Sequence, residues 1–118
     1  MKINALDLFC GIGGLTYGMQ SAGINVVAGF DFEPSCRFAY EINNNTTFVH
    51  KDIKELKAGE LDSYYPKDTE IKVLIGCAPC QPFSSYSHRY KGSSASEGKL
   101  DLLDYFGKQI KLVKPEIV

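Results

Sequence analysis

The residues best suited to covalent chemistry lie in the segment GCAPCQPFSSYS, residues 76–87. Cys80 follows Pro79 there, and both come just after a hydrophobic run, residues 71–76, that predicts a buried strand. Open α/β sheets bind their ligands at the carboxyl ends of the strands, so a cysteine at such an edge is a candidate nucleophile. The rigid φ of Pro79 would fix the backbone beside that thiol.

A glycine-rich turn, DLFCGIGGL at residues 7–15, is the second chemical signature. Glycines there let the backbone approach a ligand closely, next to the start of a predicted helix. A dinucleotide fingerprint would need a third glycine where the chain has Thr16, which argues against a pyrophosphate. Asp31, twenty residues after Gly11, is placed where a ribose hydroxyl finds its partner. The pattern indicates a nucleoside-like ligand, and a tight turn without any ligand stays open as the alternative.

Acidic and apolar residues follow the next two predicted strands. Asp31 is followed by Phe32, and Asp52 by Ile53. Because parallel strands end at one edge of the sheet, we expect carboxylates for ribose and adenine hydrogens to lie there beside apolar faces for the base. Each residue is weak evidence alone, since Asp52 also suits a loop or a helix cap and Phe32 also suits the core.

Short β-rich runs alternate with helical patterns, which predicts an α/β fold of βαβ units with a mostly parallel sheet. The predicted strands are residues 4–9, 25–30, 47–50 and 71–76, and the predicted helices are 14–22, 34–43 and 100–113. A charged connection spans 54–68 and a polar loop spans 84–98. Pro115 ends the last helix, and a fifth strand that starts at 116 is expected to be cut short by the end of the sequence.

Composition limits the size, charge and cellular compartment that can be expected of the protein, but it does not indicate a function. A chain of 118 residues with 44% hydrophobic content forms one globular domain with a core. The net charge of −1 gives no overall attraction for a polyanion, but residues 1–87 sum to −3 (seven basic, ten acidic) and residues 88–118 to +2 (six basic, four acidic). Polyanion contacts are therefore expected in the second part. Four cysteines, no signal peptide and no apolar run of membrane length favour a reducing cytoplasm.

Taken in order, these motifs resemble the N-terminal part of the catalytic domain of the cytosine-C5 DNA methyltransferases, over nearly all of residues 1–118. DLFCGIGGL is similar to the family's first motif, Lys51-Asp52-Ile53 to its third, and APCQPFS to its catalytic motif. The resemblance implies a Rossmann-like, S-adenosylmethionine-dependent methyltransferase fold with three αβα layers, truncated in the fifth strand. It also implies DNA methylation within a restriction-modification system, in the cytoplasm of a prokaryote.

The resemblance assigns roles to individual residues. Cys80, beside Pro79, would add to carbon 6 of a cytosine flipped out of double-stranded DNA, so that carbon 5 takes the methyl group of S-adenosyl-L-methionine. A basic, aromatic-containing loop would close over the base or contact phosphates, and it comprises Gln81, Ser84, Ser85, Tyr86, Ser87, His88, Arg89 and Lys91. The residues expected at the cofactor are Phe9, Cys10, Gly11, Ile12, Gly13, Gly14, Leu15, Asp31, Phe32, Glu33, Asp52, Ile53, Gly76, Pro79 and Leu102.

Other parts of the family pattern are expected beyond Val118. They are a glutamate that would stabilise charge on the cytosine ring, a target-recognition domain, and a C-terminal segment that completes the cofactor pocket. The chain alone is therefore expected to be almost inactive and to need that remaining part, or a second chain. Three alternatives stay open: a cofactor-binding fragment, a subunit of a split methyltransferase, and a family member that acts on transfer RNA.

A remote alternative is a thioredoxin-like redox centre formed by Cys77 and Cys80, which fit C-x-x-C. Such a pair opens the helix after a first strand, whereas this one follows the fourth, so Cys77 is expected to be a small apolar residue at the strand end. No metal site is expected, because Cys10 and Cys36 lack partners at ligand spacing. His50, like the other histidine, is isolated and is interpreted as a surface or loop residue.

Overall fold

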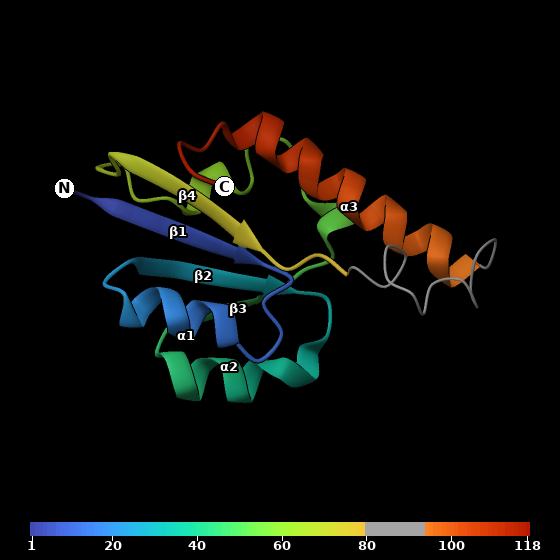
Figure 1. Cartoon of the computed structure of the whole chain (residues 1–118), viewed down its shortest axis with the longest axis horizontal. Coiled ribbons are helices and arrows are strands. Elements are labelled where there is room, and N and C mark those ends of the chain that lie inside the picture. Colours follow the sequence, from blue (N-terminus) through green and yellow to red (C-terminus); the bar gives the residue numbers. More distant parts are fainter. Residues whose placement is uncertain (80–93) are drawn as a thin grey trace.

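A parallel four-stranded sheet forms the centre of the protein (Figure 1). The computed structural model describes residues 1–79 and 94–118, with the side chains of the second range described from Leu102 onward. The strands lie in the order β3-β2-β1-β4, and each pairs in parallel with its neighbours. Their bounds are β1 Ile3–Leu8, β2 Asn25–Asp31, β3 Thr47–His50 and β4 Ile71–Gly76.

Helices and short 3₁₀ turns connect these strands. The α-helices are α1 Gly14–Ser21, α2 Arg37–Asn44 and α3 Ser94–Val113. The 3₁₀ turns are η1 Pro34–Cys36, which leads into α2, and η2 Ile53–Glu55 and η3 Asp62–Tyr64, which lie between β3 and β4.

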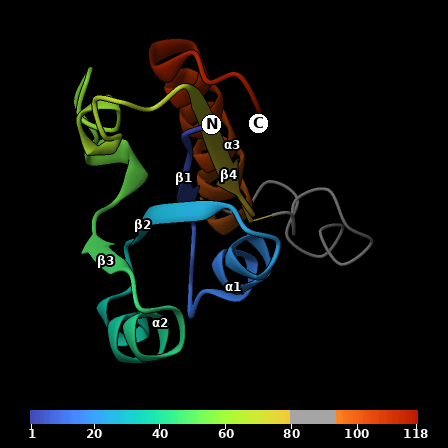
Figure 2. The same cartoon turned by 90° about the vertical axis from the view of Figure 1, so that its left-hand side faces the viewer.

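The side chains of β1 alternate between the two faces of the sheet, as the period of a strand requires. Leu6 and Leu8 belong to the larger apolar core, which includes Val113 of α3. Ala5 lies in a second cluster, against which Met19 of α1 packs. Figure 2 shows α1 and α2 on one side of the sheet and α3 on the other. The result is the predicted three-layer αβα arrangement, and the α/β class with a parallel sheet is confirmed.

The start of a fifth strand is present as a single parallel bridge between Val73 of β4 and Ile117. Val73 also pairs with Ala5 of β1, so Ile117 lies on the free side of β4. The backbone N–H groups of Glu116 and Ile117 donate to the Lys72 carbonyl. These bonds place residues 116–117 as the next neighbour in the order β3-β2-β1-β4, where the predicted fifth strand belongs.

The third helix begins earlier than its sequence pattern predicts. It starts at Ser94, whereas residues 94–98 were expected in a loop and the helix from 100. Serines and Gly98 are loop signals by type, but Ala95 and Glu97 are strong helix formers and a single glycine costs a helix only about 1 kcal/mol. Neither α3 nor any other helix among the described residues is long and apolar enough to cross a membrane.

Element ends differ from the predicted ones by small amounts that have local causes. The strand β1 stops at Leu8, because Phe9 has φ 56° and turns the chain out of the sheet. The helix predicted from residue 34 opens instead as the 3₁₀ turn η1, with the Glu33 carboxylate accepting a hydrogen bond from the Ser35 N–H. Asn45 ends α2 in the left-handed conformation, at φ 50°.

Candidate functional site

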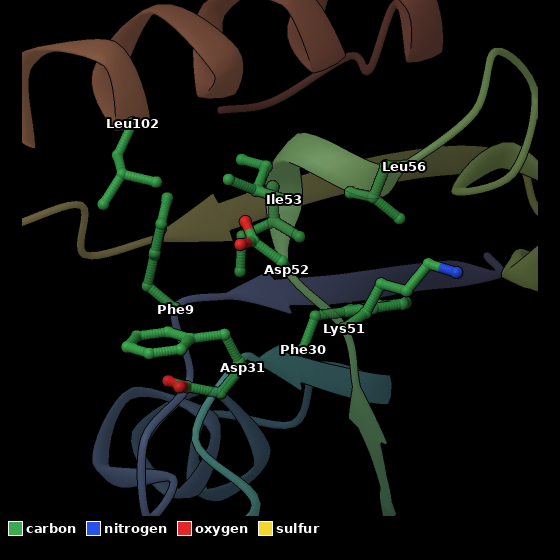
Figure 3. A pocket seen from close by; sticks show the side chains of 10 residues that line it. Phe9, Phe30, Asp31, Lys51, Asp52, Ile53, Leu56 and Leu102 are labelled. Carbon is green, nitrogen blue, oxygen red and sulfur yellow. The ribbon is translucent and has the colours of Figure 1, made fainter. Parts of the chain in front are cut away.

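A pocket lies at the carboxyl ends of β1, β2 and β3, the edge at which the sequence predicted a ligand (Figure 3). Side chains from several elements converge on it, including Asp31 at the end of β2, Ile53 of η2 and Leu102 of α3. The complete lining is Leu8, Phe9, Phe30, Asp31, Phe32, Lys51, Asp52, Ile53, Leu56 and Leu102. Two carboxylates therefore share this pocket with a predominantly apolar wall.

Asp31 joins the pocket to the glycine turn. Its Oδ2 atom accepts a hydrogen bond from the Gly11 N–H at 2.9 Å, and its Oδ1 atom accepts one from the Glu33 N–H at 2.9 Å. The Asp31 carbonyl oxygen accepts a third, from the Lys51 N–H at 3.0 Å. A carboxylate offers about four lone-pair sites, so Asp31 keeps capacity to accept hydroxyl hydrogens from a ligand.

The apolar wall combines buried and exposed side chains. Ile53 is buried, and the Phe9 ring lies 6.2 Å from the Phe106 ring of α3. Phe32 is 62% exposed, which rules out the alternative of a core residue and leaves its ring free to cover a base. Asp52 lines the pocket and also accepts a hydrogen bond from the Lys54 N–H at 2.9 Å, so it is an η2 cap as well.

The glycine turn is held against α2 rather than standing free. Gly11 and Gly13 have φ values of 54° and 94°, which glycine adopts at little cost. A Cβ atom on Gly13 would lie 2.2 Å from Asn44 Nδ2 and 2.7 Å from Tyr40 Cδ2. Gly13 is thus required for packing against α2, while Gly11 is required for its left-handed backbone conformation, which places its N–H toward Asp31.

A buried chain of polar groups lies beneath this turn. The Thr16 hydroxyl donates to Asp7 Oδ2 at 2.7 Å and lies 3.0 Å from the Tyr40 hydroxyl. Since Thr16 uses its one hydrogen on Asp7, Tyr40 must donate to Thr16. Burial raises the pKa of Asp7 to about 6, against the hydrogen bonds from Thr16, which lower it. In the sequence pattern Thr16 stands only where a dinucleotide fingerprint would have a glycine, and the pattern does not predict this network.

The cysteines occupy different environments. Cys10 is buried with Tyr40 and Phe48 on the α2 side of the sheet, so its side chain is not part of the pocket lining. Burial, with a further contribution from the Asp7 carboxylate, raises the pKa of the Cys10 thiol well above its usual value. Cys77 was expected to be an apolar strand-end residue, but it lies one residue beyond β4 and is exposed.

The predicted nucleophile and nucleic-acid loop lie outside the described residues. This applies to Cys80, Gln81, Ser84, Ser85, Ser87, Arg89 and Lys91. Pro79 is half-buried and is the last described residue before them. The β4 strand does end at the pocket edge of the sheet, which is the placement the motif requires.

Several residues predicted at the cofactor do not line the pocket, and their contact with a cofactor stays a prediction. Ile12 and Leu15 are exposed, and Gly14 is the first residue of α1. Glu33 is exposed and caps η1. Gly76 ends β4, where a Cβ atom would lie 2.9 Å from the Leu8 carbonyl oxygen and 3.0 Å from the Phe106 ring. None of these residues is among those that line the pocket.

Four lining residues were not predicted: Leu8, Phe30, Lys51 and Leu56. A sequence signal for three of them existed. Leu8 and Phe30 are the last inward-facing residues of predicted strands, and Lys51 adjoins Asp52 in the third motif. Leu56 follows the 3₁₀ turn η2. The charged connection 54–68 predicts a weak helical turn and a loop, but not that this leucine faces the pocket.

Comparisons with known proteins agree with this arrangement. A family model described as C-5 cytosine-specific DNA methylase matches residues 3–118. The chain belongs to this family. The Type II methylase M.HgiDII of Herpetosiphon aurantiacus is 45% identical over 113 residues, which cover 96% of this chain and 30% of that protein. A tRNA (cytosine(38)-C(5))-methyltransferase of Schizosaccharomyces pombe is 29% identical, over 75% of this chain and 26% of that protein.

A solved structure supports the fold. A prophage-encoded protein of Escherichia coli, assigned as a DNA modification methyltransferase, superposes with a TM-score of 0.75 at 26% identity. The match covers 97% of this chain and 30% of that one. The cytosine-methylase chain described here thus spans about a third of the length of these relatives.

Proposed function

We propose that the chain is the amino-terminal part of an enzyme that transfers a methyl group from S-adenosyl-L-methionine to carbon 5 of cytosine in DNA. The observation that carries this proposal is the pocket in which Asp31, Phe32, Asp52 and Ile53 lie together beside the glycine turn, in a chain of the cytosine-methylase family. The ribose hydroxyls and the amino group of an adenosine donate hydrogen bonds, which carboxylates can accept, and its planar base fits between an aromatic face and an apolar wall.

The residues of the pocket have distinct roles in this proposal. Asp31 accepts from ribose hydroxyls while its bonds to the turn hold it in place. Phe32 covers one face of the adenine, and Asp52 accepts from its amino group. Ile53 and Leu102 complete the apolar wall and exclude water. When bound, S-adenosyl-L-methionine supplies an electrophilic methyl group on its sulfonium.

Cys80 is proposed as the nucleophile on the strength of its motif. Its thiolate forms a bond to carbon 6 of the cytosine, which moves electron density to carbon 5. Carbon 5 would then take the methyl group as the bond from that group to the sulfonium sulfur breaks, leaving S-adenosyl-L-homocysteine. Loss of the carbon 5 proton to a base would expel the Cys80 thiolate and restore the ring double bond. A thiolate suits both steps because it is a strong nucleophile and a good leaving group.

The target cytosine is proposed to leave the duplex, because Cys80 cannot reach carbon 6 inside a base stack. Arg89 and Lys91 fall in a segment without acidic residues, residues 84–94, so phosphate contacts are assigned to that segment. The rest of the enzyme, as a continuation of the chain or a second polypeptide, would select the sequence around that cytosine.

Trapping on an oligonucleotide that contains 5-fluorocytosine tests this chemistry. Release of Cys80 requires loss of the proton on carbon 5, and fluorine at that position cannot be lost in this way, so the covalent adduct persists. We expect a covalent adduct with S-adenosyl-L-methionine present, and a much higher yield when the remaining part of a relative is supplied as a second polypeptide. The Cys80→Ser variant is the matched control. An adduct that persists in this variant would refute the assignment of the nucleophile.

Transfer RNA is the second candidate substrate, and the relative from S. pombe that acts on tRNA is the observation in its favour. The same trap can be offered as DNA and as a tRNA anticodon stem-loop with the 5-fluoro base. Preferential adduct formation with RNA would replace DNA by tRNA in the proposal.

A further inference from the structure

His50 is tied to the rim of the pocket, although its sequence context suggested an isolated surface residue. It is the last residue of β3 and is exposed. Its Nε2 atom lies 2.9 Å from the carbonyl oxygen of Phe32. A carbonyl oxygen can only accept, so the His50 ring must carry its hydrogen on Nε2.

A second bond runs beside the first. The Lys51 N–H donates to the Asp31 carbonyl oxygen at 3.0 Å. Consecutive residues at the end of β3 therefore hold the consecutive carbonyls of Asp31 and Phe32. The Lys51 bond is backbone to backbone and is available to any residue except proline, whereas the bond to Phe32 depends on the histidine side chain.

The hydrogen bond to the Phe32 carbonyl connects β3 to the residue that carries the exposed aromatic ring. Phe32 is 62% exposed, so little packing of its own side chain holds the ring in position. Its direction is then set by the backbone of residues 31–33. That backbone is fixed on one side by the Asp31 carboxylate, through Gly11 and Glu33, and on the other by His50.

We infer that His50 is a positioning residue that holds Phe32 as the face on which the adenine of the methyl donor stacks. This role rests on the proposed cofactor pocket. His50 does not line the pocket, and it acts through the Phe32 carbonyl. It would favour ligands that carry a planar base over ligands that present only the methionine portion.

Two substitutions of His50 test whether its role depends on the N–H donor or only on the bulk of its side chain. His50→Gln keeps an N–H donor at a similar reach, while His50→Leu removes it and keeps bulk. Because His50 is exposed, neither change disturbs the core. Thr47→Leu, at an exposed position of the same strand about 10 Å away, is the matched surface control.

The experiment is calorimetric titration of each protein with S-adenosyl-L-homocysteine, repeated in a Phe32→Leu background. We expect His50→Leu to weaken binding about 3- to 10-fold, which corresponds to about 0.7–1.4 kcal/mol, within the range of one intramolecular hydrogen bond. His50→Gln and Thr47→Leu should stay within about 2-fold of wild type. In the Phe32→Leu background, the effect of His50→Leu should disappear, since there is no aromatic face left to position.

The outcomes of this experiment distinguish failure of the role of His50 from failure of the proposed cofactor pocket. Wild-type affinity in His50→Leu, or an equal loss in the presence and absence of the Phe32 ring, would overturn the role of His50 and leave the cofactor pocket intact. Absence of binding by the wild-type chain, both alone and with the remaining part of a relative supplied as a second polypeptide, would instead refute the pocket as proposed, and the role of His50 with it.

Discussion

The two faces of the sheet differ in the interactions that hold them, and successive residues of β1 show the contrast. Leu6 and Leu8 point into an apolar core that continues to the pocket wall on the α3 side. Asp7, between them, points to the other side and is buried with Thr16 and Tyr40 through hydrogen bonds. The α3 side, called the apolar face below, provides contact area. The α1 and α2 side also holds apolar clusters around Ala5 and Phe48, but it adds this hydrogen-bonded network and is called the polar face below.

This difference matches the tasks of the two faces. The apolar face holds a pocket wall whose interaction with a base depends on contact area and exclusion of water. The polar face fixes a glycine turn, and hydrogen bonds do this better than dispersion because they specify angle as well as distance. Asp31 connects the two, since it lies in the pocket and bonds to Gly11 of the turn.

The largest expected effect is on the apolar face. Leu6 is fully buried on the central strand, with Ala28 and Leu74 as its cross-strand neighbours. Leu6→Ala should lower the free energy of unfolding by about 3–4 kcal/mol, because it removes apolar contact and leaves a cavity. Urea denaturation measures this, with Leu6→Met as the volume-conserving control. A loss below 1 kcal/mol would mean that this face repacks freely.

The next effect is a pH dependence that belongs to the polar face. Folded Asp7 has a pKa of about 6, above the ordinary 3.8 of an unfolded chain, so the folded state holds the proton more tightly. The contribution to stability is therefore present in full below about pH 4 and is lost as the pH rises through about 6, in total about 2–3 kcal/mol.

Comparison of wild type with Asp7→Asn isolates this contribution. Glu33 and Glu60, whose pKa values are lowered by hydrogen bonds from the backbone, change stability in the opposite direction, but both proteins carry them. Urea midpoints at pH 4 and pH 7.5 should show the difference between the two proteins. Identical pH profiles would contradict the assignment of a titrating buried Asp7.

A substitution at Gly29 tests how tightly Tyr40 is packed on the polar face. A Cβ atom on Gly29 would lie 2.4 Å from Tyr40 Cζ, in a ring that is fully buried. Gly29→Ala should therefore cost about 2 kcal/mol through overpacking. Gly18→Ala is the matched control, since a Cβ atom there meets nothing within 4 Å, and it should stabilise α1 by about 0.5–1 kcal/mol. Thermal melts of both variants measure these changes, and equal effects would refute the close approach.

The smallest effect concerns a single hydroxyl. Tyr40→Phe removes the donor to Thr16 and keeps the ring between Gly13 and Gly29. It should cost about 1 kcal/mol, the net contribution of one buried hydrogen bond. Chemical denaturation measures it, and the loss should shrink in a Thr16→Val background. If Tyr40→Phe lowered the free energy of unfolding equally in that background, the hydrogen bond to Thr16 would not be the cause of the loss.

Much of the fold was predictable because its signals are local. The strands β3 and β4 have the predicted bounds, and Gly14 opens α1 as its glycine turn suggested. Phe9 was predicted as the end of the first strand, but its left-handed backbone depends on the turn that follows it. The start of α3 at Ser94 was missed because serine and glycine content outweighed the helix formers nearby.

The order of residues along the chain determined the motifs by itself. A glycine turn after one strand, Asp31 after the next and Asp52 after the third must meet at one edge once the strands are parallel, because that edge is set by strand direction alone. Family membership follows from the same residues, since it is written in types and spacings.

Only the tertiary structure decided which side chains from distant elements meet. Tyr40 lies between Gly13 and Gly29, Leu56 joins the pocket from the connection that follows β3, and His50 bonds to Phe32 across two strands. No local pattern encodes these contacts, because each depends on the packing of helices and strand ends that are far apart in the sequence. The sequence determined where a ligand could lie, and packing determined which residues hold the site in shape.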